Sequence, residues 1–414
     1  MSAPAAQPAT AALRHRDFRA YVTALVTSRL GTSMQAATLL WHVTEVAPEG
    51  WRAEALGGIA LARVLPTIGF AVLGGVAADR VDRRRLLVAT QLLLALPPAV
   101  LALWSFVGLS TVWPFFALSF LAATFEAFDF PARHVMLASL VPPPDLRSAV
   151  SLVALGNRTA VVAGPLLAGL ALATLPRWVV YAANALSFLV VVRAVLSVRE
   201  LVLPPSGPAR PERASEGLRF LFGHAVLRGA VLLDFAASFF ASATVLLPVI
   251  AQDVLHVGPA AYGWLRAATP IGAWLASLAV VRFGAHVERT GRVLLVVGVT
   301  YGLGTVAFGL ATTVWLAFLA LVGVGAADTV GTVLRSVLRQ EETPHDLRGR
   351  AIGLQMIFFR GGPQLGNLEA AAVASAFGAV VSVVSGGLGA ALAALVIGAL
   401  TPELRAYRSS PPRG

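Results

Sequence analysis

The stretch "GGVAADRVDRRR", Gly74–Arg85, holds six charged side chains between two strongly apolar segments. The segment before it reads "LARVLPTIGFAVL" and the segment after it reads "LLVATQLLLALPPAVLALW". A bilayer core of about 30 Å is spanned by about 20 predominantly apolar residues in a helix. The stretch therefore has the pattern of a short charged loop between two membrane-spanning helices.

Composition extends this interpretation to the whole chain. Of the 414 residues, 57% are hydrophobic and 13% are charged, whereas an ordinary soluble domain has about 25% charged residues. Apolar runs long enough to span a bilayer recur along the chain, and clusters of proline and glycine separate them. The sequence predicts an all-α membrane protein with twelve transmembrane helices, at residues 18–44, 55–78, 86–108, 112–139, 148–172, 177–198, 226–252, 259–283, 293–311, 313–338, 349–376 and 378–400.

Residue usage excludes several kinds of chemistry. The chain has no cysteine, which excludes disulfides, thiolate metal sites and cysteine nucleophiles. All 32 residues of the Lys and Arg class are arginine, and a Walker phosphate-binding loop needs a lysine. No catalytic constellation or metal-ligand spacing occurs, so we expect no enzyme activity, no cofactor and no metal. The N-terminus lacks a small-residue cleavage site, so we expect no removable signal peptide.

The placement of arginine predicts the orientation in the membrane. With the N-terminus in the cytoplasm, most arginines fall in cytoplasmic loops and only Arg52 and Arg177 face outward. This distribution follows the positive-inside rule, and it predicts cytoplasmic N- and C-termini in a multi-pass protein of a bacterial cytoplasmic (inner) membrane. The net charge of +11 is divided among separate loops, so we expect no continuous basic groove for nucleic acid.

The chain also divides into two related halves. "HRDFRA" from His15 aligns with "HAVLRGA" from His224 at an offset of 209, and "DLRSAVSL" from Asp145 aligns with "DLRGRAIGL" from Asp346 at an offset of 201. A long polar stretch, Ser197–Gly217, lies between the halves. Parallel repeats of this kind are common in secondary transporters. We predict a six-helix bundle, a cytoplasmic linker and a second six-helix bundle with a short cytoplasmic tail, over residues 1–198, 199–225 and 226–414.

Two motifs carry a resemblance to a known family. The opening stretch resembles the Gly-x-x-x-Asp-Arg-x-x-Arg-Arg signature between the second and third helices of the major facilitator superfamily, matched by Gly75, Asp79, Arg80, Arg83 and Arg84. The segment "GNRTAVVAGPLLAG", residues 156–169, resembles the fifth-helix glycine-proline motif of its antiporter branches. Two further segments, "FDFPARHVMLASLVPPPDLRSAV" and "SRLGTSMQAATLLW", look like the enterobactin-exporter and drug-efflux branch. The resemblance implies the major facilitator fold of two pseudo-symmetric six-helix bundles, usually as a monomer.

The same resemblance implies a conformational latch on the cytoplasmic side. It places Asp79 and Arg83 in a charge cluster, with Asp129 of the fourth span as the candidate partner. Gly75 allows the two helices to approach closely, and the arginines of the loop are able to pair with carboxylates. The alternative is that the arginines only fix the topology.

A second, degraded copy of the loop lies in the other half. Glu288 replaces the aspartate, Arg289 and Arg292 remain, and Gly291 stands where the first copy has Asp82. Asp328 in the tenth span stands where Asp129 stands in the fourth. This arrangement predicts a weaker second latch.

The glycine-proline segment predicts a bend and a close helix contact. Gly156, Gly164 and Gly169 remove side chains from the fifth span, and Pro165 deletes a backbone donor. The alternative is that glycine and proline are simply common in membrane helices. Arg360, followed by "GGPQLG", marks a similar bend in span eleven.

Ionisable side chains inside the spans need an explanation, because each costs several kcal/mol unless it pairs or faces water. In the superfamily, spans one, four, seven and ten line the cavity. Arg29 and Glu126 come near the midplane on spans one and four, and Asp234 lies nearer the cytoplasm on span seven. Either Glu126 carries a proton as the cavity opens to each side, or it forms a fixed ion pair with Arg29.

Arginines on spans two, five, eight and eleven lie on the faces that the resemblance places between the halves. They either bind an anionic substrate or pair with Glu369 and backbone carbonyls, and they are Arg63, Arg158, Arg266 and Arg360. We expect a secondary active transporter, a proton-coupled exporter of a small molecule such as a drug, siderophore or other metabolite, working by alternating access. The alternatives are an uptake transporter, or a membrane enzyme or sensor on the same scaffold.

Overall fold

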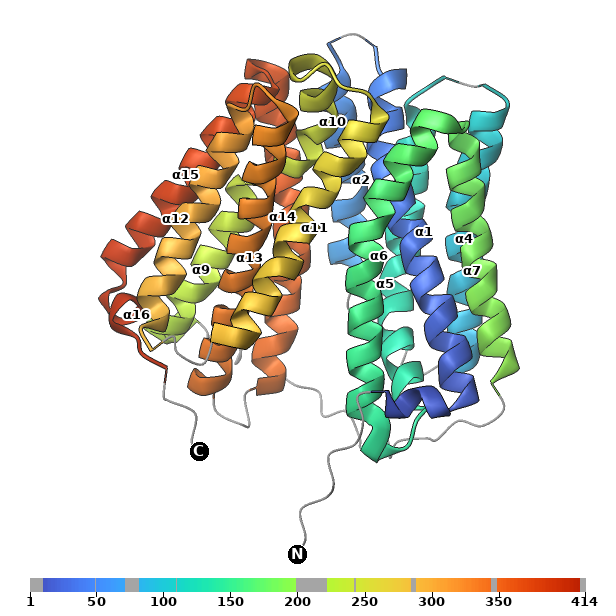
Figure 1. The fold of residues 1–414 in the computed structure, drawn as a ribbon, viewed down its shortest axis with the longest axis horizontal. Coiled ribbons are helices and arrows are strands. Elements are labelled where there is room, and N and C mark those ends of the chain that lie inside the picture. The colour runs from blue at the N-terminus through green and yellow to red at the C-terminus, as the bar shows by residue number, and fades with distance from the viewer. Residues whose placement is uncertain are drawn as a thin grey trace, which may run out of the picture. The chain divides into compact units, whose positions relative to one another are not determined.

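The computed structural model describes residues 10–48, 50–70, 82–108, 110–198, 222–241, 243–283, 288–343 and 348–409. Helices and turns make up all of this described part (Figure 1). The long helices are α1 (Arg16–Val46), α2 (Arg52–Gly69), α4 (Arg83–Phe106), α5 (Trp113–Ala138), α6 (Leu146–Thr174), α7 (Arg177–Ser197), α9 (Ala225–Phe240), α11 (Pro259–Phe283), α12 (Thr290–Gly309), α13 (Val314–Glu342), α14 (Arg348–Phe377) and α15 (Ala379–Leu400). Short helical segments complete the set: η1 (Ala11–Arg14), η2 (Pro143–Asp145), η3 (Ala243–Leu246), α10 (Leu247–Val249), η4 (Ile250–Val254) and α16 (Pro402–Ala406).

The predicted spans and these helices coincide. Their ends agree within four residues, with two exceptions. The predicted end of span two lies outside the described residues, and in span seven α9 ends at Phe240 while short helical segments continue to Val254. Of the described helical segments, 8 are long and apolar enough to cross a membrane by length and composition. Two of the others, α1 and α5, carry ionisable side chains in mid-helix: Arg29, Glu126 and Asp129.

Span seven is not one regular helix. After α9 ends, the chain continues through the 3-10 turn η3, one turn of α10 and the π-helical turn η4. Pro248 lies in this stretch and lacks a backbone N–H, so it cannot take part in a regular helical ladder. Directly after η4, His256 adopts a left-handed backbone with φ of 51°, which is uncommon for a residue other than glycine. π-turns inside helices occur frequently at functional sites.

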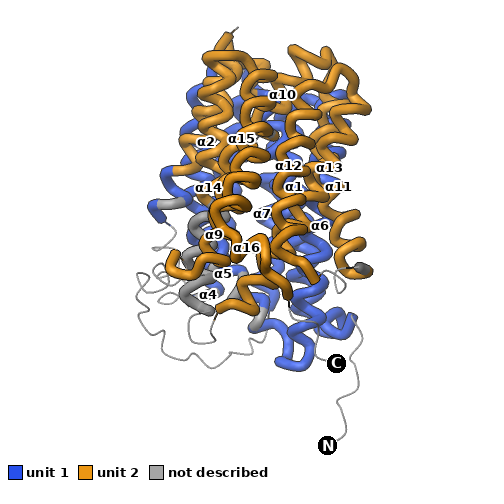
Figure 2. Tube along the Cα trace, turned by 90° about the vertical axis from the view of Figure 1, so that its left-hand side faces the viewer, with its two compact units in different colours: residues 1–42, 65–209 blue, residues 43–64, 210–414 orange. Residues whose placement is uncertain are grey.

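The chain divides into two compact units (Figure 2). Unit 1 comprises Met1–His42 and Leu65–Ala209, and unit 2 comprises Val43–Val64 and Arg210–Gly414. The main division at 209/210 falls within the predicted linker, and the outer end of α1 with most of α2 belongs to unit 2. The assignment of residues 1–198 and 226–414 to separate bundles stays a prediction.

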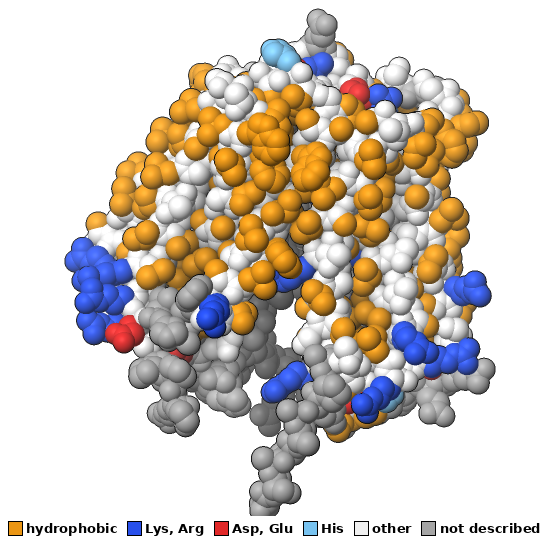
Figure 3. Space-filling view, in the orientation of Figure 1, with side chains coloured by type: hydrophobic (Ala, Val, Ile, Leu, Met, Phe, Trp, Pro, Cys, Tyr) orange, Lys and Arg blue, Asp and Glu red, His pale blue; other side chains and the backbone are white. Residues whose placement is uncertain are grey.

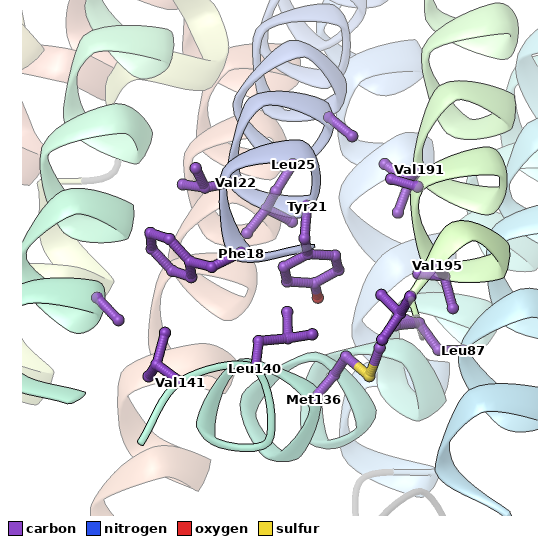
Figure 4. Close-up of a cluster of buried hydrophobic side chains, with 14 of the residues drawn as sticks. Phe18, Tyr21, Val22, Leu25, Leu87, Met136, Leu140, Val141, Val191 and Val195 are labelled. Carbon is purple, nitrogen blue, oxygen red and sulfur yellow. The ribbon is translucent and has the colours of Figure 1, made fainter. Parts of the chain in front are cut away.

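Each unit has a hydrophobic core at one end of its helices. In unit 1 this core contains Phe18, Tyr21, Leu87, Met136 and Val191, and Figure 4 shows these side chains converging from α1, α4, α5 and α7. In unit 2 the core joins α9, α12, α13 and α15 to the short α16. Burial of these faces fixes the helices on which the polar residues below are carried.

Candidate functional site

The charged loop is described only from Asp82 onward. Gly75, Asp79 and Arg80 lie outside the described residues, and the side chain of Arg83 does too. The residues that follow have defined hydrogen bonds. The Asp82 carboxylate accepts the Arg85 N–H at 2.8 Å and caps α4. Arg84 donates to the Leu196 carbonyl at the end of α7. The described part of the loop thus joins the start of α4 to the end of α7, a contact that the sequence analysis did not include.

Asp129 is buried on α5 with several polar partners. Its carboxylate forms an ion pair with Arg133, four residues later on the same helix. From α4, Thr90 donates to it at 3.1 Å and Gln91 donates to it as well. Asp129 therefore has the pairing that a buried charge needs. Its predicted pairing with the charged loop stays a prediction.

The mid-helix charges that the sequence predicts near the midplane lie close together in unit 1. Arg29 on α1 is exposed, Glu126 on α5 is half-buried, and the two interact electrostatically. Arg158 on α6 is also exposed. Contacts between α1 and α6 bracket the two arginines, because Gly156 meets Val26 and Gly164 meets Ser33. Arg29 and Arg158 therefore lie at the same level on two helices in contact.

The glycine-proline segment brings α6 against α1 without ending the helix. A Cβ atom at Gly156 or Gly164 would collide with the α1 side chains named above. Pro165 and Gly169 are buried, and α6 continues past the proline to Thr174. The absence of side chains at this contact is what membrane helices use to pack closely.

We expect Gly164→Ala to lower the stability of the folded protein by about 1–3 kcal/mol, because the added methyl group overpacks the α1 contact. The measurement is the thermal unfolding midpoint of the purified protein in detergent. Gly323→Ala is the matched control: Gly323 lies inside α13 with nothing within 4 Å of an added Cβ, so alanine should leave the midpoint unchanged or raise it. Equal unfolding midpoints for the two variants would show that Gly164 is not needed for packing against α1.

In unit 2, a polar cluster is built around one buried arginine. Arg335 on α13 pairs with Asp234 on α9 at 2.7 Å, and Thr332 accepts a second bond from its guanidinium at 3.1 Å. Asp328, two turns earlier on α13, interacts electrostatically with both Arg335 and Asp234. The sequence analysis identified both acids but not the arginine that joins them.

The second copy of the charged loop is bound by the C-terminal tail. Tyr407 accepts the Gly291 N–H at 3.2 Å through its carbonyl, and Glu288 accepts the Ser409 N–H at 3.2 Å. Thr290 and Ser409 share a hydroxyl hydrogen bond of 2.8 Å. A Cβ at position 291 would collide with the tail, so glycine is required where the first copy has the capping Asp82. A second latch between this loop and Asp328 stays a prediction.

The tail is fixed from its other side as well. The Tyr407 hydroxyl donates to the Glu341 carboxylate at 2.8 Å. Burial and this hydrogen bond raise the pKa of Tyr407, so the hydroxyl stays protonated and remains a donor. Leu404 of α16 is fully buried in the core of unit 2.

The histidines that aligned in the sequence occupy matching positions. His15 pairs with Asp145 at 2.7 Å in unit 1, and His224 pairs with Glu342 at 3.2 Å in unit 2. Each histidine stands at the start of the first helix of its repeat, α1 or α9. Each pair thus links the beginning of the first helix of a repeat to a residue at or just after the end of the fourth helix of that repeat.

One ion pair and one hydrogen bond join distant segments within unit 2. Arg52 at the start of α2 pairs with Asp253 in η4. Gln252 donates to Thr44 near the end of α1 at 3.0 Å. These contacts attach the end of α1 and the start of α2 to the irregular end of span seven. Arg360 lies in α14, and its side chain is outside the described residues.

Two six-helix halves related by sequence repeat, with ionisable groups in mid-helix, define the class of polytopic secondary transporters. Residues 7–410 match the sequence model of the transmembrane secretion effector family, and the chain belongs to this family of the major facilitator superfamily. The predicted superfamily is thereby confirmed, and with it the fold and the class of transporter.

Relatives and solved structures agree with this assignment. The enterobactin exporter EntS of Shigella boydii serotype 18 is 27% identical over 347 residues, covering 83% of this chain and 82% of its own. EntS of Citrobacter koseri is 26% identical over 342 residues, covering 82% of each chain. A bacterial homologue of the human lysosomal transporter Spinster matches the fold with a TM-score of 0.74 at 14% identity, covering 96% of this chain and 99% of that one. The nucleoside transporter NupG matches with a TM-score of 0.73 at 13% identity, covering 95% and 100%.

Proposed function

We propose that this protein is a proton-coupled exporter that moves a small organic anion out of a bacterial cytoplasm by alternating access. The family and the exporter relatives support transport outward. The observation that carries the rest is the group of mid-helix charges in unit 1, Arg29, Glu126 and Arg158. In this proposal the protein works as a monomer in the inner membrane, with both termini in the cytoplasm.

The substrate class follows from the side chains of that group. Two exposed arginines lie at one level on adjacent helices, and Glu126 interacts electrostatically with Arg29. Arginine binds carboxylates and phosphates through two parallel hydrogen bonds, so two arginines at one level suit an anionic substrate. A siderophore with acidic groups is one member of this class, and the names of the relatives point in the same direction.

Proton coupling is assigned to Glu126. It is half-buried on a span that the superfamily uses to line the cavity, and Arg29 competes with a proton for its charge. For an inward proton gradient to drive outward transport, the protein must carry the two alternately, with a proton on Glu126 in the inward stroke and the anion bound in the outward stroke. Asp234, predicted nearer the cytoplasm on span seven, is the next candidate acid, but Arg335 already pairs with it.

The latch is assigned to the cytoplasmic side, which Asp79, Arg83 and Asp129 keep closed in the outward-open state. Gly75, Arg80 and Arg84 support its loop. Arg84 already anchors the end of that loop on α7. In the second half, Glu288, Arg289 and Arg292 with Asp328 form the weaker copy.

The outer contacts of unit 2 are assigned a gating role. Thr44 and Gln252, with the pair Arg52 and Asp253, must separate for the outer side to open. We expect that Thr44→Cys/Gln252→Cys, joined by a short bifunctional thiol reagent, transports at less than about a tenth of its uncrosslinked rate. Cleavage of the crosslink should restore the rate.

The matched control uses a pair that should not separate. His15→Cys/Asp145→Cys carries the same reagent within unit 1, where the two side chains contact each other. The chain has no native cysteine to interfere. A crosslinked Thr44→Cys/Gln252→Cys protein that transports as fast as the control would remove the gate.

The substrate class is tested in inside-out vesicles that contain the protein, with a panel of anionic, neutral and cationic compounds of similar size. We expect accumulation of anionic members only, and weaker accumulation after Arg158→Gln. Accumulation of cations with no effect of Arg158→Gln would overturn the anion assignment. It would leave the transporter class intact.

A further inference from the structure

The docked C-terminal tail builds a cluster of four arginines at one end of unit 2. The backbone and hydroxyl bonds between residues 288–291 and 407–409 hold the two segments side by side. With the neighbouring residues included, at 288–292 and 405–409, each segment carries two arginines three residues apart, and all four side chains are exposed: Arg289, Arg292, Arg405 and Arg408. In Figure 3, blue side chains gather over α16 and the start of α12.

Nearby acids do not neutralise the cluster. Glu288 and Glu403 are exposed beside it, which leaves two positive charges in excess. Glu341 accepts the Tyr407 hydroxyl and Glu342 pairs with His224, and among the described residues neither carboxylate forms an ion pair with the four arginines. Within the part of the chain that the structure describes, none of the four arginines forms an ion pair.

The surface next to the cluster is apolar and suits an acyl chain. On α12, Val296 and Leu303 are exposed at helical spacing beyond Arg292, and on α15, Leu392 and Leu400 are exposed up to the residue before the tail. These two helices pack against each other and against α16. Each apolar stripe ends at the arginines. A phospholipid has the same arrangement, with apolar tails that end at a charged headgroup.

We propose that Arg289, Arg292, Arg405 and Arg408 form a binding site for the headgroup of an anionic phospholipid, with its acyl chains on α12 and α15. The shared chemistry is a phosphate ester, which arginine binds through paired hydrogen bonds. The lipid is favoured over free phosphate because the apolar stripes continue directly from the arginines. The site stands independently of the proposed substrate and of proton coupling.

The test uses the full-length protein purified in neutral detergent and titrated with phosphatidylglycerol that carries a fluorescent acyl chain. We expect Arg405→Gln/Arg408→Gln to weaken binding roughly thirtyfold, because two arginine contributions to an anionic headgroup are lost. Arg147→Gln/Arg193→Gln is the matched control. It removes the same two positive charges from exposed positions that lie far from the cluster in the sequence. This control should bind as the wild type does.

A second variant separates a built site from net charge. Gly291→Ala keeps all four arginines but forces the tail away from the loop, so it should also weaken binding by about tenfold or more. If this variant does not fold, as judged by size-exclusion chromatography, the result for Arg405→Gln/Arg408→Gln tests the proposal without it. Phosphatidylcholine should bind weakly to every protein.

Three results would overturn the proposal. Equal loss in the Arg147→Gln/Arg193→Gln control would mean that surface charge alone attracts the lipid. Displacement of the lipid by millimolar inorganic phosphate would assign the cluster to free phosphate. Unchanged binding by Arg405→Gln/Arg408→Gln would show that the lipid binds elsewhere.

Discussion

Replacing Glu126 with glutamine is expected to abolish accumulation of substrate against a gradient while leaving downhill exchange intact. Glutamine keeps the size and hydrogen-bonding groups of the side chain but cannot release a proton. The variant should also lose the pH dependence of transport. The measurement is uphill transport and counterflow in vesicles across a range of pH, with the exposed Glu54→Gln at the start of α2 as the matched control.

The alternative role of Glu126 as a fixed partner of Arg29 predicts a different pattern. In that case Glu126→Gln lowers the unfolding midpoint, because a charge near the midplane loses its partner. The double variant Arg29→Gln/Glu126→Gln then recovers stability. If Glu126→Gln still transports uphill and keeps the pH dependence, Glu126 does not carry the coupled proton.

Asp79→Asn and Arg83→Ala are expected to reduce transport by at least about tenfold while leaving folded protein in the membrane, because a charge cluster at a switch sets the populations of the two conformations. Transport rates and the amount of folded protein should be measured together. Arg85→Gln is the matched control, since its exposed side chain lies in the first turn of α4, directly after the signature. If both latch variants transport at the full rate, the charge cluster serves only to fix the membrane topology.

The helices were largely predictable from the sequence because a bilayer imposes a nearly fixed length of apolar chain. The triple proline at 142–144 and Pro176 marked connections that the structure places directly before α6 and α7. The irregular path of span seven was not predicted, although Pro248 was a local signal for it. A hydropathy pattern reports that a span exists but not whether its hydrogen-bond ladder is intact.

The polar partners were less predictable, for a physical reason. Arg133 lies four residues after Asp129, so its pairing was accessible from helical spacing alone. Asp234 and Arg335 stand on different helices, and so do Thr44 and Gln252. Such pairs depend on tertiary packing, which no local pattern encodes. The docking of the tail on Gly291 belongs to the same group.

The most direct test of the account is efflux from cells that are loaded with an exported anion and that contain this protein. A proton uncoupler should stop the efflux while cellular ATP is held constant, and an imposed inward proton gradient should restart it in de-energised vesicles. Glu126→Gln should show neither response. Uphill efflux that continues with the uncoupler present, or net uptake driven by the same gradient, would contradict a proton-coupled exporter.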